Sequence, residues 1–337
     1  MAPGRPLRMH PVLCPLCGSD SRSVFVRGTD LYHHLPGEFT LTRCSCGLVY
    51  INPQPEPAEL QAYYPDDYLA HQIRSRPPKL GRHRAFKTFL LRWYYGCPVG
   101  GPTPPPMLRA LLKPLLFLFS RGTMKSMIPF RGSGSLLDVG CGNGGWLAPL
   151  AECGWRVQGV ELDEPAARAA NDAGVPVACG TLHDARFNDA SFDVVRLHYV
   201  FEHLLNPGDV LDEIRRILKP DGLCYIRIPN IASLTFRWFG RFWFPLDVPR
   251  HVVHYTPATF TRLAAAHGFA VRRITFKSPP SGFFTSIEFM RQAGVLPRVL
   301  VPLRESCPLC RNLWRPMGWV IDRVRLGDIV QFELVKA

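Results

Sequence analysis

The feature that most constrains the fold is a regular alternation of short β-rich runs and helical runs from residue 135 onward. Alternation of this kind is typical of units in which two parallel strands are joined by a crossover helix. We therefore expect an α/β domain with a doubly wound, seven-stranded, mostly parallel sheet. The predicted strands are 135–139, 156–160, 175–178, 192–197, 223–228, 269–276 and 329–335.

Three helices are predicted between these strands, at 146–153, 164–173 and 207–218. The last should end at Lys219-Pro-Asp-Gly222, because Pro and Gly do not readily continue a helix. No internal repeat interrupts the pattern.

A chain of 337 residues is long enough for one full α/β domain and a smaller accessory unit. We expect a cysteine-rich module at 1–72, a basic and Pro-rich linker with an apolar helix at 73–130, and the α/β domain at 131–337. A helical insertion is expected within that domain at about 277–327.

The formal net charge of +13 suits an anionic partner such as nucleic acid, a phosphorylated substrate or an acidic membrane surface. No stretch looks like a signal peptide, and no apolar run is long enough to span a bilayer. We therefore expect a cytoplasmic protein, in which the 11 cysteines are metal ligands or buried thiols rather than disulfides.

A glycine-rich turn follows the first predicted strand. The run Leu136-Leu-Asp-Val-Gly-Cys-Gly-Asn-Gly144 passes from strand to helix, and its glycines let the backbone approach a ligand closely. Gly140, Gly142 and Gly145 also fit the dinucleotide pattern G-x-G-x-x-G. The glycines alone therefore predict only a nucleotide-containing ligand.

Two carboxylates narrow the choice of ligand. Asp138 directly precedes the loop, where it suits the ammonium group of a cofactor that carries an amino acid and would repel a pyrophosphate. Glu161 ends the next strand and can accept hydrogen bonds from two ribose hydroxyls. Both roles favour S-adenosylmethionine, and the alternative is a purely structural loop with a strand-end acid.

In the order of its segments the chain resembles the class I S-adenosylmethionine-dependent methyltransferases. Leu137-Asp-Val-Gly-Cys-Gly-Asn-Gly144 is similar to their first motif, and Gly159-Val-Glu-Leu-Asp163 to their ribose-binding strand. Ser191-Phe-Asp-Val-Val195 with His198-Tyr-Val-Phe-Glu-His-Leu204 resembles the fourth strand and its loop, and Leu218-Lys-Pro-Asp-Gly222 resembles the approach to the fifth. The resemblance implies a Rossmann-like methyltransferase fold and is nearly silent on the methyl acceptor.

The same resemblance implies the cofactor-binding residues. Thr181 and Leu182 would lie beside the adenine, and His198 near the methionine moiety. The expected set is Asp138, Gly140, Cys141, Gly142, Asn143, Gly144, Glu161, Leu162, Thr181, Leu182 and His198.

Two close cysteine pairs, Cys14 with Cys17 and Cys44 with Cys46, each precede a glycine. Such knuckles hold Zn²⁺ in a tetrahedral site, and four thiolates leave no position for water, so we expect one structural zinc ion. The second pair has a single intervening residue, which weakens the likeness to a regular zinc ribbon, and buried or disulfide-bonded cysteines are the alternative. A third pair, Cys307 and Cys310, could supply ligands or stand alone.

The cysteine-rich segment resembles the leader of a subgroup of bacterial class I methyltransferases, some of which act on sugars or small metabolites. Few aromatic residues alternate with basic ones between Cys14 and Cys46, so nucleic acid is a less favoured partner.

On the acceptor side, His251 is the candidate catalytic base, since a histidine can accept a proton at neutral pH, and Arg250 could hold an anionic substrate. The alternative is that Asp247, Arg250 and His251 only fix a loop by hydrogen bonds. His203 is expected to cap a helix beside the pocket.

Two apolar segments also leave alternatives open. The aromatic cluster at 236–244 could be a lid over an apolar or sugar substrate, or a packing helix. The apolar segment 107–119 could pack on the domain or lie at an acidic membrane surface.

These features favour a methyltransferase that acts on a small molecule, sugar or glycolipid, with oxygen as the favoured methylated atom. The alternatives are an RNA methyltransferase, and a noncatalytic cofactor-binding protein whose zinc module recruits a partner.

Overall fold

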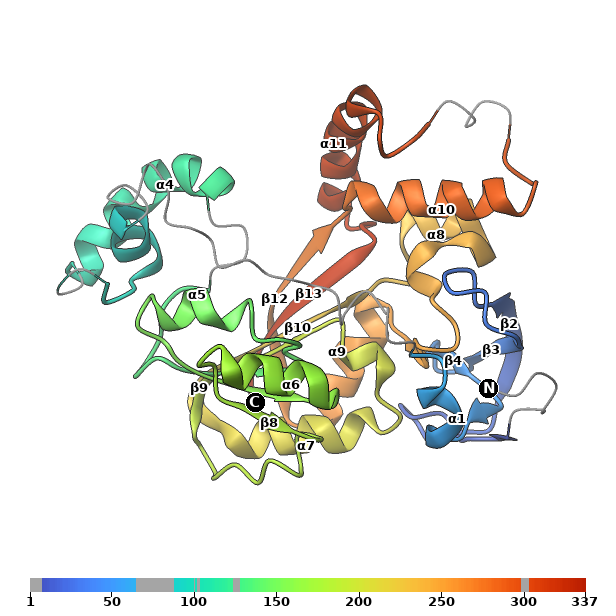
Figure 1. Cartoon of the computed structure of the whole chain (residues 1–337), viewed down its shortest axis with the longest axis horizontal. Coiled ribbons are helices and arrows are strands. Elements are labelled where there is room, and N and C mark those ends of the chain that lie inside the picture. The colour runs from blue at the N-terminus through green and yellow to red at the C-terminus, as the bar shows by residue number, and fades with distance from the viewer. Residues whose placement is uncertain (1–7, 65–87, 100, 102–103, 124–127, 298–302) are drawn as a thin grey trace. The chain divides into compact units, whose positions relative to one another are not determined.

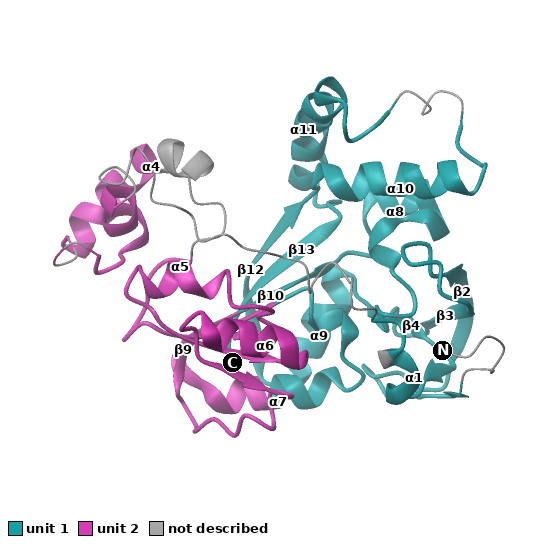
Figure 2. Cartoon of the chain, in the orientation of Figure 1, with its two compact units in different colours: residues 1–66, 198–212, 225–337 teal, residues 67–197, 213–224 magenta. Residues whose placement is uncertain are grey.

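The structure is a computed structural model that describes residues 8–64, 88–99, 101, 104–123, 128–297 and 303–337 (Figure 1). The chain divides into two compact units (Figure 2). Unit 1 comprises Met1–Asp66, His198–Asp212 and Tyr225–Ala337, and unit 2 comprises Asp67–Leu197 and Glu213–Cys224. The predicted module boundary at residue 72 and residues 73–87 of the predicted linker lie outside the described residues.

The predicted seven-stranded, mostly parallel sheet is confirmed, and its strand order is β12-β13-β10-β9-β6-β7-β8. Strand β6 is parallel to both β7 and β9, β7 is parallel to β8, and β12 and β13 are antiparallel. The strands are β6 (Ser135–Val139), β7 (Arg156–Glu161), β8 (Val177–Cys179), β9 (Phe192–His198), β10 (Leu218–Pro229), β12 (Phe269–Lys277) and β13 (Ile329–Lys336).

The start of β10 differs from the sequence-based expectation. The strand was expected to begin at 223, after the helix-ending segment Lys219-Pro-Asp-Gly222, but it begins at Leu218, directly after the helix. Lys219 Nζ donates to Asp193 Oδ1 at 2.9 Å, and Arg131 Nε donates to the Asp221 carbonyl at 2.9 Å. The predicted start of the strand was therefore wrong, because tertiary contacts hold residues 219–222 in the sheet.

Burial explains why the strands of unit 2 are mainly apolar in sequence. Every residue of β6 is buried, and so are the first six residues of β9. Parallel strands covered on both faces have this pattern, rather than an alternating one. Unit 2 also contains η1 (Leu91–Tyr95), α4 (Pro106–Thr123), α5 (Leu147–Ala151) and α6 (Glu164–Asp172), and α7 (Pro207–Ile217) begins in unit 1 and ends in unit 2.

Local signals in the sequence fix the start of α6. The Asp163 carboxylate accepts from the Ala166 amide at 2.8 Å, and a proline stands in the first turn, where its missing N–H costs nothing.

Helix α4 contains Pro114 and exposes Met107, Leu111 and Leu115. None of the helices in the described ranges combines the length and the apolar character needed to cross a membrane.

The cysteine-rich segment folds as part of a second sheet, in unit 1, with the strand order β11-β4-β3-β2. Strands β2, β3 and β4 form an antiparallel meander. Strand β11 comes from about 200 residues later in the sequence and pairs with β4, with Val253 opposite Tyr50 and His254 opposite Val49. The strands are β2 (Arg22–Thr29), β3 (Glu38–Cys44), β4 (Val49–Ile51) and β11 (Val253–His254).

The rest of unit 1 is largely helical. A buried aromatic contact joins Phe283 of α10 to Trp314 of α11, with ring centroids 3.8 Å apart. Both helices fall in the segment 277–327, where a helical insertion is predicted. The remaining elements are β1 (Met9–His10), β5 (Gln54–Pro55), α1 (Pro57–Gln61), η2 (Phe201–His203), α8 (Leu234–Phe239), η3 (Gly240–Phe242), η4 (Phe244–Leu246), α9 (Pro257–Ala266), α10 (Pro280–Gln292) and α11 (Pro308–Arg323).

The fully buried guanidinium of Arg250 links three segments of unit 1. It donates to both carboxylate oxygens of Asp30, at 2.7 and 3.0 Å, and to the Tyr63 carbonyl at 3.0 Å. It also donates to Asp247 Oδ1 through Nε at 3.0 Å and Nη2 at 2.6 Å. Every N–H group of the side chain is thus engaged, so none remains for the anionic substrate that the sequence had suggested.

We predict that Asp30→Ala lowers the free energy of unfolding by about 3 kcal/mol or more, because it leaves one end of a buried guanidinium unpaired. Urea denaturation measures the effect. The matched control is Asp20→Ala, which removes the exposed partner of Arg22 and should cost less than about 1 kcal/mol. Equal losses in the two variants would contradict the assignment.

The Asp30–Arg250 pair also predicts that the stability of the protein depends on pH. Burial raises the pKa of Asp30, but the hydrogen bond and charge of Arg250 outweigh it and hold the pKa below its usual value. The stabilisation is therefore complete above about pH 4 and is lost as the pH falls through the lower pKa of the folded state. The difference in stability between wild type and Asp30→Ala should shrink over that range.

Candidate cofactor and metal sites

The glycine-rich loop that follows β6 has the conformation that its sequence requires. Gly140, Gly142 and Gly144 have φ angles of 68°, 55° and 70°, in a region that residues with a side chain rarely adopt. The amides of Gly140 and Cys141 donate to the Val160 carbonyl, at 2.8 and 3.2 Å. The loop is therefore tied to the end of β7.

Asp138, directly before this loop, is 2% exposed and has one free carboxylate oxygen. Its Oδ2 pairs with Arg196 Nη1 at 2.6 Å, whereas Oδ1 has no hydrogen-bond partner among the described residues. Burial, opposed by Arg196, raises the pKa of Asp138 to about 6. The carboxylate is therefore mostly ionised at pH 7, and Oδ1 can accept from a cationic ligand group.

Glu161 ends β7 and holds the loop by hydrogen bonds. Its Oε2 accepts from the Gly142 amide at 2.7 Å, and its Oε1 accepts from the Asp163 amide at 3.0 Å. Each carboxylate oxygen has a second lone pair, so the group can still accept hydroxyl hydrogens. The loop contacts also fix the direction of the side chain. Asn143 supports the same turn, since its Oδ1 accepts from the Gly145 amide at 3.2 Å.

The remaining predicted cofactor residues differ in their surroundings. Leu162 is exposed and Leu182 is buried. Thr181 is exposed, and both its amide and its hydroxyl donate to Asp184 Oδ2, at 2.8 and 2.6 Å. His198 is the last residue of β9 and belongs to unit 1.

These residues suit an S-adenosylmethionine ligand on chemical grounds. An ammonium group would satisfy the orphaned Asp138 Oδ1, and ribose hydroxyls would find acceptor capacity on Glu161. A pyrophosphate, by contrast, would meet two carboxylates within a single loop region.

Sequence reasoning missed the partner of Asp138. Arg196 lies opposite Asp138 in the parallel β6–β9 register, and its guanidinium stacks 3.6 Å from the centre of the Trp146 ring. An arginine within the mainly apolar run 194–197 was the available signal, because a buried charge requires a partner.

The four predicted zinc-ligating cysteines gather in unit 1, with their sulfur atoms all within 4.8 Å of one another. Cys14 Sγ lies 3.5 Å from Cys46 Sγ, and Cys17 Sγ lies 3.5 Å from Cys44 Sγ. Tetrahedral ligation with Zn–S bonds of about 2.3 Å would separate the sulfurs by about 3.8 Å. The cluster therefore has the size of a tetrathiolate zinc site.

Backbone turns build this cysteine cluster. The amide of Gly18 donates to the Cys14 carbonyl and that of Gly47 to the Cys44 carbonyl, each at 2.8 Å. The turn that carries Cys44 and Cys46, although it has a single intervening residue, thus still places both thiols in the cluster. All cysteines are free, so the disulfide alternative is not realised.

The third cysteine pair takes no part in this cluster. Cys307 caps α11, where its Sγ accepts from the Cys310 amide at 3.4 Å. Within the described residues, the four-cysteine group contains neither Cys307 nor Cys310.

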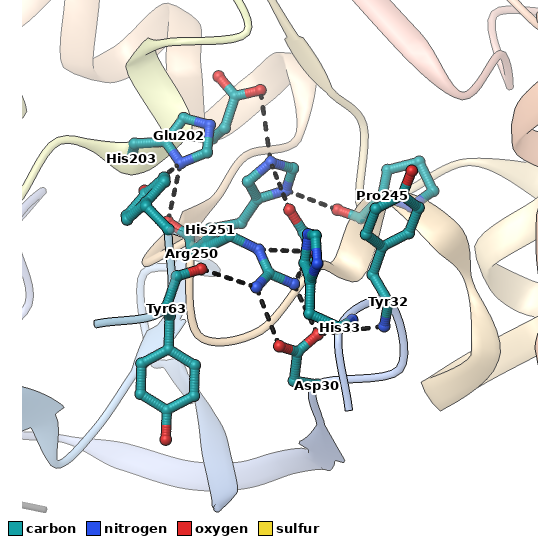
Figure 3. A network of polar contacts seen from close by, with 11 residues as sticks. Asp30, Tyr32, His33, Tyr63, Glu202, His203, Pro245, Arg250 and His251 are labelled. Atoms are coloured by element: carbon teal, nitrogen blue, oxygen red, sulfur yellow. Dashed lines mark hydrogen bonds and ion pairs between the residues drawn. The ribbon is translucent and has the colours of Figure 1, made fainter. Parts of the chain in front are cut away.

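His251 lies in a buried polar network with Glu202 and His203 (Figure 3). Its Nδ1 lies 2.8 Å from the Pro245 carbonyl, and its Nε2 lies 3.9 Å from Glu202 Oε1 and 3.8 Å from Asp247 Oδ2. Burial lowers the pKa of His251 and raises that of Glu202 to about 8. Burial also lowers the pKa of His203 to about 3. The expected capping role of His203 was wrong: His203 is the last residue of η2, but Leu204 is the C-cap, and His203 Nδ1 lies 3.0 Å from the Arg250 carbonyl.

Comparison with known proteins identifies the α/β domain. Residues 107–274 match the Methyltransf_23 family, described as a methyltransferase domain. A probable S-adenosylmethionine-dependent methyltransferase of Mycolicibacterium smegmatis is 33% identical over 40% of this chain and 52% of its own length. The ubiquinone biosynthesis O-methyltransferase of Caulobacter vibrioides is 33% identical over 30% of this chain and 43% of its own.

A third relative, 24-methylenesterol C-methyltransferase 2 of Oryza sativa subsp. japonica, is 35% identical over 35% of this chain and 32% of its own length. The chain thus spans only about a third to a half of these curated relatives. A solved S-adenosylmethionine-dependent methyltransferase from Archaeoglobus fulgidus shares 19% identity and a TM-score of 0.43, over 66% of this chain and 94% of that one. On the family match and the loop geometry together, this chain contains a class I S-adenosylmethionine-dependent methyltransferase domain.

Proposed function

We propose that the protein transfers a methyl group from S-adenosylmethionine to a small-molecule acceptor. The observation that carries the proposal is the β6–loop–β7 arrangement, in which Asp138 offers an unpartnered buried oxygen and Glu161 offers acceptor capacity at the neighbouring strand end. The family match supports the same assignment.

When bound, the cofactor supplies a methyl group that is already activated by its sulfonium. The protein then has to hold and align the reactants, and remove a proton where the acceptor carries one. Asp138 would bind the ammonium group, held in place by its pair with Arg196, and Glu161 would bind the ribose. The loop glycines let the backbone approach, and Thr181 and Leu182 are the proposed adenine contacts.

The proposed acceptor is a small molecule, sugar or glycolipid, methylated on oxygen. Two relatives support a small acceptor, since they are named for ubiquinone biosynthesis and for a methylenesterol. Their names differ in the methylated atom, oxygen in one and carbon in the other, so the product must identify that atom.

Contact with an acidic membrane surface is a further part of this proposal. Helix α4 exposes Met107, Leu111 and Leu115, at 87%, 75% and 57%, with Lys113 among them. Apolar side chains beside basic ones are typical of helices that lie in a membrane interface.

We predict that Glu161→Ala weakens S-adenosylmethionine binding by about 1–3 kcal/mol, through the loss of hydrogen bonds to the ribose. Isothermal titration calorimetry measures this. Glu164→Ala, which removes an exposed carboxylate paired with Arg168 at the start of α6, is the control and should bind normally. Equal affinity in Glu161→Ala and wild type, or a wild-type preference for NAD, would refute the assignment.

We predict one structural zinc ion at Cys14, Cys17, Cys44 and Cys46. The double variant Cys14→Ser with Cys44→Ser should lose the ion, whereas Cys307→Ser with Cys310→Ser should retain it, because only the first four thiols share a site. Elemental analysis of the purified proteins decides. Full zinc retention in the first variant, or a folded wild type without metal, would count against the site.

We predict that His251 acts on the acceptor side. His251→Ala should keep its cofactor affinity and thermal stability, yet lower the rate of methyl transfer by about 10²–10⁴-fold if the imidazole is a general base. Labelled cofactor, assayed against separated lipid, glycan, metabolite and RNA fractions, first identifies the acceptor. An unchanged rate would remove His251 from the mechanism, and unfolding would favour its role in fixing the loop.

A further inference from the structure

Unit 1 contains a second group of side chains of the kinds that bind metal ions, separate from the cysteine cluster. Glu202, His203 and His251 each offer one ligand atom, and these atoms all lie within 4.8 Å of one another (Figure 3). Two of these residues come from η2, and the third from the segment between η4 and β11.

Both histidines have their ring orientation fixed by the backbone. Nδ1 of His251 lies 2.8 Å from the Pro245 carbonyl, and Nδ1 of His203 lies 3.0 Å from the Arg250 carbonyl. A carbonyl oxygen can only accept, so in His251 Nδ1 carries the hydrogen and Nε2 carries the lone pair. Nδ1 of His203 also lies 2.9 Å from the Tyr64 hydroxyl, which can donate or accept. With the hydrogen on Nδ1, which the Arg250 carbonyl requires, both oxygens accept and Nε2 of His203 carries the lone pair. Metal-binding histidines almost always show this arrangement, in which the non-ligating nitrogen donates to a carbonyl or carboxylate.

Glu202 supplies an independent observation. Glu202 is 1% exposed, and neither of its carboxylate oxygens has a hydrogen-bond partner among the described residues. Burying such a group without a partner is costly, and protonation would remove the charge without giving the carboxyl a partner. The side chain therefore requires a ligand that the protein atoms do not provide.

The spacing around His251 fits a bridging ion. Its Nε2 lies 3.9 Å from Glu202 Oε1 and 3.8 Å from Asp247 Oδ2, too far for direct hydrogen bonds. Two ligand bonds of about 2.0–2.2 Å each, made to one ion at an open angle, span such a distance. A water molecule could also bridge these atoms, and the experiment below separates the two cases.

We propose that Glu202, His203 and His251 bind a divalent transition-metal ion through one carboxylate oxygen and two Nε2 atoms. Mixed imidazole and carboxylate ligands suit Mn²⁺, Fe²⁺, Co²⁺ or Zn²⁺ better than the all-oxygen ions Ca²⁺ and Mg²⁺. Three protein ligands leave coordination positions open for water or for an oxygen atom of another molecule. With the ion bound, the Nε2 lone pair of His251 is a ligand; without the ion, the same lone pair is the one that a general base requires.

This inference does not rest on methyl transfer, because ion binding can be measured without cofactor or acceptor. Mn²⁺ is the probe, since it prefers oxygen and nitrogen ligands and competes poorly for four thiolates that already hold zinc. The full zinc-loaded chain is titrated with Mn²⁺, and the free ion is followed by electron paramagnetic resonance.

We expect wild type to bind one Mn²⁺ per chain, and both Glu202→Gln and His251→Gln to bind it about 100-fold more weakly or worse. His267→Gln is the matched control, because His267 pairs with Asp212 near the surface and should not affect the affinity. Thermal melts establish that the variants fold. If wild type binds no Mn²⁺, as expected when a water molecule bridges these atoms, the proposal is overturned whatever the variants do. Wild-type affinity for Mn²⁺ in Glu202→Gln would also overturn it.

Discussion

Within the described part of unit 1, the buried guanidinium of Arg250 joins segments that lie far apart in the sequence. Arg250 engages Asp30 from the end of the β2 region, the Tyr63 carbonyl after α1, and Asp247 from its own segment. Desolvating a guanidinium is expensive, so the arrangement persists only because every N–H group has an acceptor. The cysteine-rich segment and residues 247–255 therefore form one folded body, although the sequence suggests a separate module followed by a linker.

Much of the fold could be predicted, because its signals are local. Strands such as β6 and β9 are buried on both faces and appear as apolar runs, and the loop after β6 requires glycine at its positive φ angles. The cysteine pairs carry their own spacing and glycine turns, so the four-thiol cluster was also found from the sequence. In each case a few adjacent residues hold the information.

The parts that the sequence did not reveal depend on long-range pairing. Nothing near Val253 indicates that it pairs with Tyr50, and nothing near Arg250 identifies Asp30 as its partner. Asp138 was identified as a ligand-binding carboxylate, but its pairing with Arg196 follows only from the register of β6 and β9. The early start of β10 has the same origin, since Lys219 is held by Asp193.

The backbone of Val252 connects the cysteine cluster to Glu202. Val252 accepts a hydrogen bond from the Ile51 amide of β4 and donates one to the Glu202 carbonyl, each at 2.9 Å. Strand β4 leaves the Cys44–Gly47 turn after a single residue, so this backbone chain connects the thiol cluster to Glu202. Linkage between two binding equilibria is reciprocal, so any free energy by which a ligand at the cysteine turn changed the affinity at Glu202 would appear, equal in size, as an effect of occupancy at Glu202 on the affinity of the cysteines.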